Sequence, residues 1–172
     1  TNKGIMLIHQ QNAHERILFE RYQQAMDGKA VATQRSLFPA SLNVSPQDAV
    51  MLNDILEDLH QLGYHVEPFG KNTFVIQGTP ADVEQGNESF AIELLLEQIK
   101  HFSSDVKFSK REKVIRSLAQ QHSVKAGKAL TQKEMKQLVE DLFQCHQPNV
   151  TALGNPTYTE LKKEDLEKLF GK

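Results

Sequence analysis

The order of apolar and polar residues near the start of the chain predicts a short strand that leads directly into a helix. The run from Ile5 to Ile8 is apolar enough for a buried strand. Asn12 is of the type that caps helix N-termini, and Glu15, three residues later, completes a capping box with it. One stripe of the following helix is apolar, with members four residues apart: Leu18, Tyr22 and Met26. Polar side chains gather where the strand meets the helix, so we expect a site at this junction.

A second block, from about residue 37 to residue 102, has the pattern of a small β-α-β-β-α unit. Ser45 and Pro46 form a strong helix start, because serine caps a helix and proline suits its first position. Two strands, 64–69 and 73–77, follow this helix, and another helix runs from residue 87 or 89 to residue 102. The expected apolar side of that last helix comprises Ala91, Leu94, Leu95, Gln98 and Phe102. Nothing in this block has the character of a catalytic centre.

The rest of the chain predicts further helices and one more strand. Thr131 and Glu134 have the spacing of a capping box, so a helix begins there. We expect this helix to turn five side chains inward: Met135, Leu138, Val139, Leu142 and Phe143. A strand over 157–161 and a short helix over 164–170 close the chain. The pattern as a whole predicts an α+β fold.

Composition and charge narrow the possible classes of protein. The chain has 172 residues, and its apolar and charged fractions are those of a globular protein, so we expect no extensive disorder. No apolar run approaches the roughly 20 residues that span a bilayer, so no membrane contact is expected. The single cysteine, Cys145, excludes an internal disulfide and fits a reducing compartment. The formal net charge of −2 gives the molecule no general attraction to nucleic acid.

Positive charge is nevertheless concentrated between residues 107 and 128. The candidates for contacts with DNA phosphates in this stretch are Lys110, Arg111, Lys113 and Arg116. The same charges also suit the solvated face of a helix, and the sequence leaves both interpretations open. We expect DNA binding to be weak at most and to weaken further with added salt.

Three stretches of the chain carry a recognisable pattern in a fixed order. Residues 7–20 match L-I-D-Q-H-A-A-H-E-R-x-x-Y-E, with identical residues at these positions: Gln10, Ala13, His14, Glu15, Arg16 and Glu20. Residues 124–135 match the last twelve positions of A-V-x-A-G-x-x-L-x-x-x-E-M, and residues 154–161 match G-R-P-T-x-x-E-L except at Asn155. Taken together, these stretches resemble the C-terminal domain of MutL-family mismatch-repair proteins, and the resemblance covers nearly the whole chain.

The resemblance implies a two-subdomain fold. Residues 1–36 and 105–172 would form an internal, homodimerising subdomain, and residues 37–104 an inserted external, regulatory subdomain. ATP and magnesium would bind only to the ATPase domain that precedes this region in the family, so no cofactor is expected here. The implied function is homodimerisation and partner docking in DNA mismatch repair, with the mismatch-recognition protein contacted through the full-length protein. Such a protein would act in the bacterial cytoplasm, at the nucleoid.

Many members of this family are metal-dependent endonucleases, and the resemblance allows their site to be compared position by position. Five of its ligand-type positions hold other residue types here: His9, Gln11, Gln120, Thr151 and Leu153. Glu15 and Glu20 are retained. Because carboxylate, imidazole and thiolate ligands together hold the metal in such sites, we expect no endonuclease and no bound metal. The alternative is a divergent DNA-nicking enzyme that uses the two glutamates with scattered histidines.

The segment Gln34-Arg35-Ser36-Leu37-Phe38-Pro39 fits Q-x-x-L-x-P, which resembles the motif by which MutL proteins dock on the replicative sliding clamp. Gln34 would satisfy polar groups at the rim of a pocket, Leu37 would fill the pocket, and Pro39 would hold the segment extended. So small a contact predicts weak binding, on the order of tens of micromolar or poorer. In the competing interpretation, Leu37 and Phe38 are core residues of an incoming strand.

Overall fold

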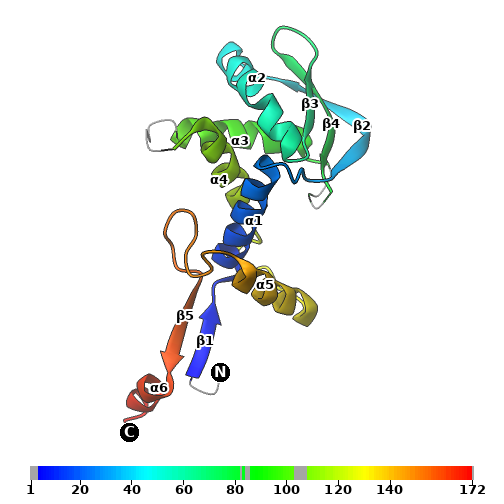
Figure 1. The fold of residues 1–172 in the computed structure, drawn as a ribbon. Coiled ribbons are helices and arrows are strands. Elements are labelled where there is room, and N and C mark those ends of the chain that lie inside the picture. Colours follow the sequence, from blue (N-terminus) through cyan, green and yellow to red (C-terminus); the bar gives the residue numbers. More distant parts are fainter. Residues whose placement is uncertain (1–3, 82, 84–85, 103–107, 172) are drawn as a thin grey trace. The chain divides into compact units, whose positions relative to one another are not determined.

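The computed structural model describes residues 4–81, 83, 86–102 and 108–171. Its elements follow the chain in this order: β1 (Gly4–Ile8), α1 (Gln10–Met26), β2 (Thr33–Asn43), α2 (Pro46–Gln61), β3 (His65–Pro68), β4 (Thr73–Pro80), α3 (Glu88–Phe102), α4 (Lys110–His122), α5 (Gln132–Gln144), β5 (Tyr158–Lys162) and α6 (Lys163–Leu169) (Figure 1). The strands form two small antiparallel sheets, so the predicted α+β class is confirmed. No helix in the described ranges is long and apolar enough to cross a membrane.

Packing divides the chain into two units. Unit 1 comprises Thr1–Glu20 and Ser123–Lys172, and unit 2 comprises Arg21–His122. Helix α1 begins in unit 1 and continues into unit 2, so the chain passes from one unit to the other within a helix. The subdomain boundaries expected from the resemblance, residues 1–36 with 105–172 and residues 37–104, stay a prediction.

Unit 2 contains a three-stranded sheet in the order β2-β4-β3, which α2 and α3 contact. The Ser45 hydroxyl caps α2 by accepting the Asp48 amide at 3.2 Å, as the sequence predicts. Gly63 follows the helix with φ +88°, a conformation that costs glycine little. The fully buried apolar residues of this unit include Leu52, Ile55, Leu59, Ile76, Ile92 and Leu95.

The buried face of α3 differs from the one expected. The side chains that it buries are Ile92, Leu95, Leu96 and Ile99. Of the expected set only Leu95 is among them, and the other four members are half-buried: Ala91, Leu94, Gln98 and Phe102. The helix is apolar on more than one side, so periodicity alone placed the stripe about one residue away from its true position.

Unit 1 consists of a two-stranded ribbon, α5, α6 and the first part of α1. In the ribbon, β1 pairs with β5 in a register that sets Gly4 opposite Lys162 and Ile8 opposite Tyr158. Ala13, Ile17 and Leu142 form a buried cluster, against which Ile8, Leu138, Cys145 and Tyr158 pack. The cluster is small because it draws on one stripe of α1 and one side of α5.

The expectation that α5 turns five apolar side chains inward is wrong. Thr131 does cap this helix, and its capping box with Glu134 is complete. Leu142 is buried and Leu138 is half-buried, whereas Met135, Val139 and Phe143 are 46%, 37% and 45% exposed. The sequence shows an amphipathic helix correctly, but periodicity cannot tell which neighbour covers its apolar stripe.

Candidate functional site

The junction of β1 and α1 is held together by main-chain and cap hydrogen bonds. His9 precedes the first helical residue, and its Nδ1 accepts the Asn12 amide at 3.2 Å. The His9 amide donates to the Thr157 carbonyl at 2.8 Å. Asn12 is inside the helix, where its Nδ2 donates to the Pro156 carbonyl at 2.7 Å. The predicted cap at Asn12 is therefore wrong, and with it the capping role of Glu15, because an imidazole performs this function three residues earlier.

The first turns of α1 hold the loop that follows α4. The Gln10 amide group donates to the carbonyls of Lys125 and Lys128, both at 2.9 Å. The Gln11 side-chain oxygen accepts the Ala126 amide at 3.2 Å. His14 Nδ1 accepts the Val124 amide at 2.9 Å. A nitrogen that accepts an N–H carries no proton, so this contact requires neutral His14.

Further along α1, two charged residues hold the segment that follows α5. Glu20 is only 7% exposed, and its carboxylate accepts the amides of His146 at 2.8 Å and Gln147 at 3.1 Å. Arg16 is 5% exposed and lies 3.5 Å from the Glu20 carboxylate. Its Nε donates to the Val150 carbonyl at 2.5 Å. Gln11, His14 and Glu20 of α1 thus all accept backbone amides of the same unit.

Thr151 closes the turn that precedes β5. It is 1% exposed, and its hydroxyl accepts the amides of Leu153 at 3.3 Å and Asn155 at 3.1 Å. Its own amide donates to the Asn155 carbonyl at 2.8 Å. Leu153 is 45% exposed at the tip of this turn. The hydroxyl oxygen of Thr151 therefore already accepts two hydrogen bonds that stabilise the turn.

Comparison with known proteins identifies relatives over most of the chain. The family model described as the MutL C terminal dimerisation domain matches residues 1–130. The chain belongs to this family. It is 35% identical to the DNA mismatch repair protein MutL of Chloroherpeton thalassium over 169 residues, which cover 98% of this chain and 26% of that protein. The same name belongs to relatives from Pelodictyon phaeoclathratiforme and Chlorobium phaeobacteroides, which are 32% and 31% identical over 98% of this chain and 27% of theirs. The chain spans about a quarter of the length of these relatives.

In this MutL C-terminal domain, the five altered positions that the sequence comparison set against the family's metal ligands are divided between the two units. Four of the altered positions lie in unit 1, and the fifth, Gln120, lies on α4 in unit 2. Glu15 is 7% exposed. Among the described residues, no group of three or more His, Cys, Asp or Glu side chains is placed so that it could hold a metal ion. Burial, followed by the nearby Glu20 charge, raises the pKa of the Cys145 thiol to about 11, which disfavours the thiolate needed for metal binding or nucleophilic attack.

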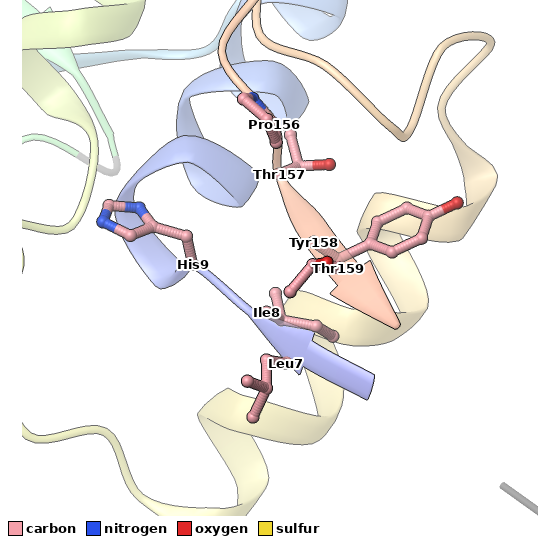
Figure 2. Close-up of a pocket in the computed structure, with 7 residues that line it drawn as sticks. All are labelled: Leu7, Ile8, His9, Pro156, Thr157, Tyr158 and Thr159. Atoms are coloured by element: carbon pink, nitrogen blue, oxygen red, sulfur yellow. The ribbon is translucent and has the colours of Figure 1, made fainter. Parts of the chain in front are cut away.

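A pocket of about 270 Å³ lies beside the junction of β1 and α1 in this MutL domain (Figure 2). Its lining comprises Leu7, Ile8, His9, Pro156, Thr157, Tyr158 and Thr159. The His9 ring and the Tyr158 ring point to opposite sides in this view. The surface of the pocket is mostly apolar, and its lining includes one imidazole, that of His9, and no carboxylate or thiol.

The expected clamp-docking segment lies on β2, which is an edge strand of the sheet in unit 2. Leu37 is 90% exposed and Phe38 is 87% exposed, and Gln34 and Pro39 are exposed as well. The interpretation of Leu37 and Phe38 as core residues is therefore wrong. The exposed position on an edge strand agrees with Pro39, which disfavours a central strand, and docking on the clamp stays a prediction.

The cations of α4 are largely engaged within unit 2. Lys110 lies 2.6 Å from the Asp54 carboxylate, and Arg111 lies 3.0 Å from that of Asp58. Arg116 pairs with Glu112 at 2.7 Å and stacks over the Phe108 ring at 3.9 Å. Lys113 is half-buried. Contacts with DNA phosphates would have to replace these ion pairs.

The sequence did not indicate the roles of Gln10, Asn12 and Arg16. Each of these side chains donates to a main-chain carbonyl more than 100 residues away along the chain. The only signal was the density of polar residues at the start of an amphipathic helix, which does not name partners.

Proposed function

We propose that this chain is a homodimerisation and partner-docking domain of a DNA mismatch-repair protein, and that it carries no endonuclease centre. The observation that supports dimerisation most directly is the uneven burial of the two units. Among the described residues, unit 2 buries 21 apolar side chains and unit 1 buries only five. A unit with so few buried apolar groups gains stability when a second copy covers its exposed ones.

The exposed apolar side chains of unit 1 mark the surface that a second copy would cover. Ile5 and Leu7, each 51% exposed, lie on the same side of β1, because alternate residues of a strand share a face. Met135, Val139 and Phe143 follow each other at intervals of four on α5, so they form one exposed stripe. Leu169 and Phe170, at the end of α6, are 76% and 80% exposed. Such surfaces are typical of obligate homodimer interfaces.

Sedimentation at micromolar concentration tests this proposal. We expect the wild-type chain to sediment at twice its 19.5 kDa mass. Val139→Asp places a charge in the centre of the α5 stripe and should shift the equilibrium to monomers. Val50→Asp is the matched control, because Val50 is a 64% exposed valine on a helix of unit 2. A wild-type chain that stays monomeric, or equal effects of the two substitutions, would contradict the proposed interface.

The absence of an endonuclease is proposed from the residues themselves. Four of the five altered positions hold an amide, a hydroxyl or an apolar side chain, and the fifth, His9, accepts the Asn12 amide through its Nδ1. The retained Glu20 already accepts two backbone amides. The full-length protein with manganese and supercoiled plasmid should therefore give no nicking above a metal-free control. Nicking that Glu15→Ala abolishes, with the fold intact by circular dichroism, would favour the divergent-nuclease alternative instead.

We also propose weak docking on the sliding clamp through Gln34, Leu37 and Pro39, with affinity on the order of tens of micromolar or poorer. The nearly complete exposure of Leu37 on an edge strand supports this second role. Gln34→Ala combined with Leu37→Ala should abolish clamp binding and leave the melting temperature nearly unchanged. Unchanged clamp binding by this double variant would overturn the proposal.

Direct DNA contact through α4 would be a minor contribution. Lys110, Arg111 and Arg116 would each exchange an internal ion pair for a phosphate contact, so the net gain would be small. Any DNA affinity should fall with salt with a slope near −0.9 per phosphate neutralised. Contact with the mismatch-recognition protein belongs in this proposal to the full-length protein, acting at the nucleoid.

A further inference from the structure

The segment 36–39 is looped out of the sheet at a defined point of β2. Thr33, Gln34 and Arg35 pair with Pro80, Thr79 and Gly78 of β4, and the ladder resumes with Ala40 opposite Ile76. Four residues of β2, Ser36 to Pro39, therefore face a single residue of β4, Gln77. Both ends of this loop are fixed by strand pairing, so the loop is a bulge with two anchored ends.

A hydrogen bond closes the loop from within. The Ser36 hydroxyl donates to the Phe38 carbonyl at 2.9 Å, which spans Leu37. Leu37 lies between the two residues that this bond joins, and Phe38 supplies its acceptor. The side chains of Leu37 and Phe38 are 90% and 87% exposed. Pro39 fixes its own φ angle before the ladder resumes. Two adjacent large apolar side chains are thus held in solvent by a short, closed segment.

Gly78 allows the anchor on the N-terminal side of the loop to approach β4. A Cβ at this position would lie 2.7 Å from Thr33 Cγ2 and 2.9 Å from the Gln34 carbonyl oxygen. Real Cβ atoms do not come so close to backbone, so an alanine here would push Thr33 and Gln34 away from β4. The strand pairing that holds Gln34 at the start of the docking segment therefore depends on glycine, which has no side chain, at position 78.

We propose that Ser36 and Gly78 are positioning residues of a preformed docking loop, which the sliding clamp binds without first ordering it. This inference rests on the clamp docking proposed above and specifies how the segment achieves it. A flexible peptide loses conformational entropy when it docks, whereas a segment that is anchored and closed in advance loses less. The loop geometry, and not only the Q-x-x-L-x-P pattern, then determines the affinity.

Clamp titrations of hydroxyl and glycine variants test this inference. Ser36→Ala should weaken clamp binding by about two- to tenfold, the range that one hydrogen bond supplies, with no change in melting temperature. Ser36→Thr keeps the hydroxyl and should restore the affinity. Ser41→Ala, an exposed serine of the same strand, is the matched control and should have no effect. Gly78→Ala should weaken binding by more than tenfold, and Gly70→Ala is its control because the nearest atom to a Cβ there is 3.7 Å away.

Backbone relaxation measured by nuclear magnetic resonance supplies a readout that needs no clamp. The amides of residues 36–38 should have order parameters near about 0.85 in the wild type, and these should fall toward about 0.6 in Ser36→Ala. Unchanged clamp affinity and unchanged order in Ser36→Ala would overturn the inference even if Gly78→Ala fails to fold. Failure of the wild type to bind the clamp would overturn the docking function itself, and the relaxation data would still decide whether the loop is preformed.

Discussion

Replacing Glu20 should reveal that this retained carboxylate holds the fold of unit 1. The residue is 7% exposed, and its two oxygens accept the backbone amides of His146 and Gln147 at 2.8 and 3.1 Å. The Arg16 guanidinium lies 3.5 Å away and is almost as deeply buried. Glu20→Ala removes this acceptor from both amides and leaves the buried Arg16 charge without this carboxylate. A small apolar side chain supplies none of these interactions.

The size of the effect follows from the kind of contact that is lost. A hydrogen bond to a charged group contributes about 1.5–3 kcal/mol, and breaking a buried ion pair by removing one partner costs about 3–5 kcal/mol. Because the contacts share one carboxylate, they do not add, and we expect Glu20→Ala to lower the free energy of unfolding by about 3–5 kcal/mol. Glu20→Gln keeps one acceptor oxygen and should lose roughly half as much, by the same reasoning.

Urea unfolding followed by circular dichroism, at one fixed protein concentration because of the proposed dimer, measures the loss. The same change should lower the melting temperature by about 6–20 °C for a chain of this size. Glu140→Ala is the control, since Glu140 is half exposed and pairs with Lys136 at 3.8 Å, and should change stability by no more than about 0.5 kcal/mol. A loss below about 1 kcal/mol in Glu20→Ala would refute the scaffolding role derived from the structure.

Four further results are expected. Leu37→Ala should change the free energy of unfolding by no more than about 0.5 kcal/mol in urea melts, because the side chain is 90% exposed, whereas a core leucine would cost about 2–5 kcal/mol. Thr131→Ala should cost about 0.5–2 kcal/mol in the same assay through loss of the α5 cap. Alkylation of Cys145 should become faster as pH rises toward its raised pKa of about 11. Because folding raises this pKa from 9.0, the contribution of Cys145 to stability should be constant below about pH 9 and fall as pH rises toward 11. His9→Asp should stabilise α1 by about 0.5–1 kcal/mol, because aspartate is the better cap, and added manganese should not raise its melting temperature.

Local signals in the sequence predicted most element starts, because their causes are local. Ser45 before Pro46 and the Thr131–Glu134 capping box act within one turn of helix, and both caps are present. The cap of α1 was misplaced at Asn12 because asparagine is a common cap and histidine is not, yet the His9 ring reaches the right amide. When two polar residues lie within one turn of each other, their residue types alone do not decide which one caps the helix.

The distribution of apolar residues predicted helices correctly and their buried faces less well. On α5, an apolar stripe has the same sequence pattern whether its own core or a second copy covers it, so Met135, Val139 and Phe143 could not be assigned. On β2, the sequence alone does not decide whether Leu37 and Phe38 are exposed docking residues or core residues. The four-residue bulge that exposes them depends on pairing with β4, which is distant in the sequence. Contacts between distant segments, such as Glu20 with His146, have no local signature at all.

The contacts of α1 give a structural reason for the residues in which this chain matches the family's strand-to-helix pattern. The matching residues Gln10, His14, Arg16 and Glu20 all bind main-chain groups of the segments that follow α4 and α5, and Arg16 and Glu20 are buried. Hydrogen bonds of this kind require the same side chains whether or not a metal is nearby. His9 and Gln11, where the match fails, make contacts that several polar residues could supply, because one is an exposed cap and the other accepts a single amide. The matching residues of α1 therefore stabilise unit 1 of this chain, and their presence alone does not indicate a metal site.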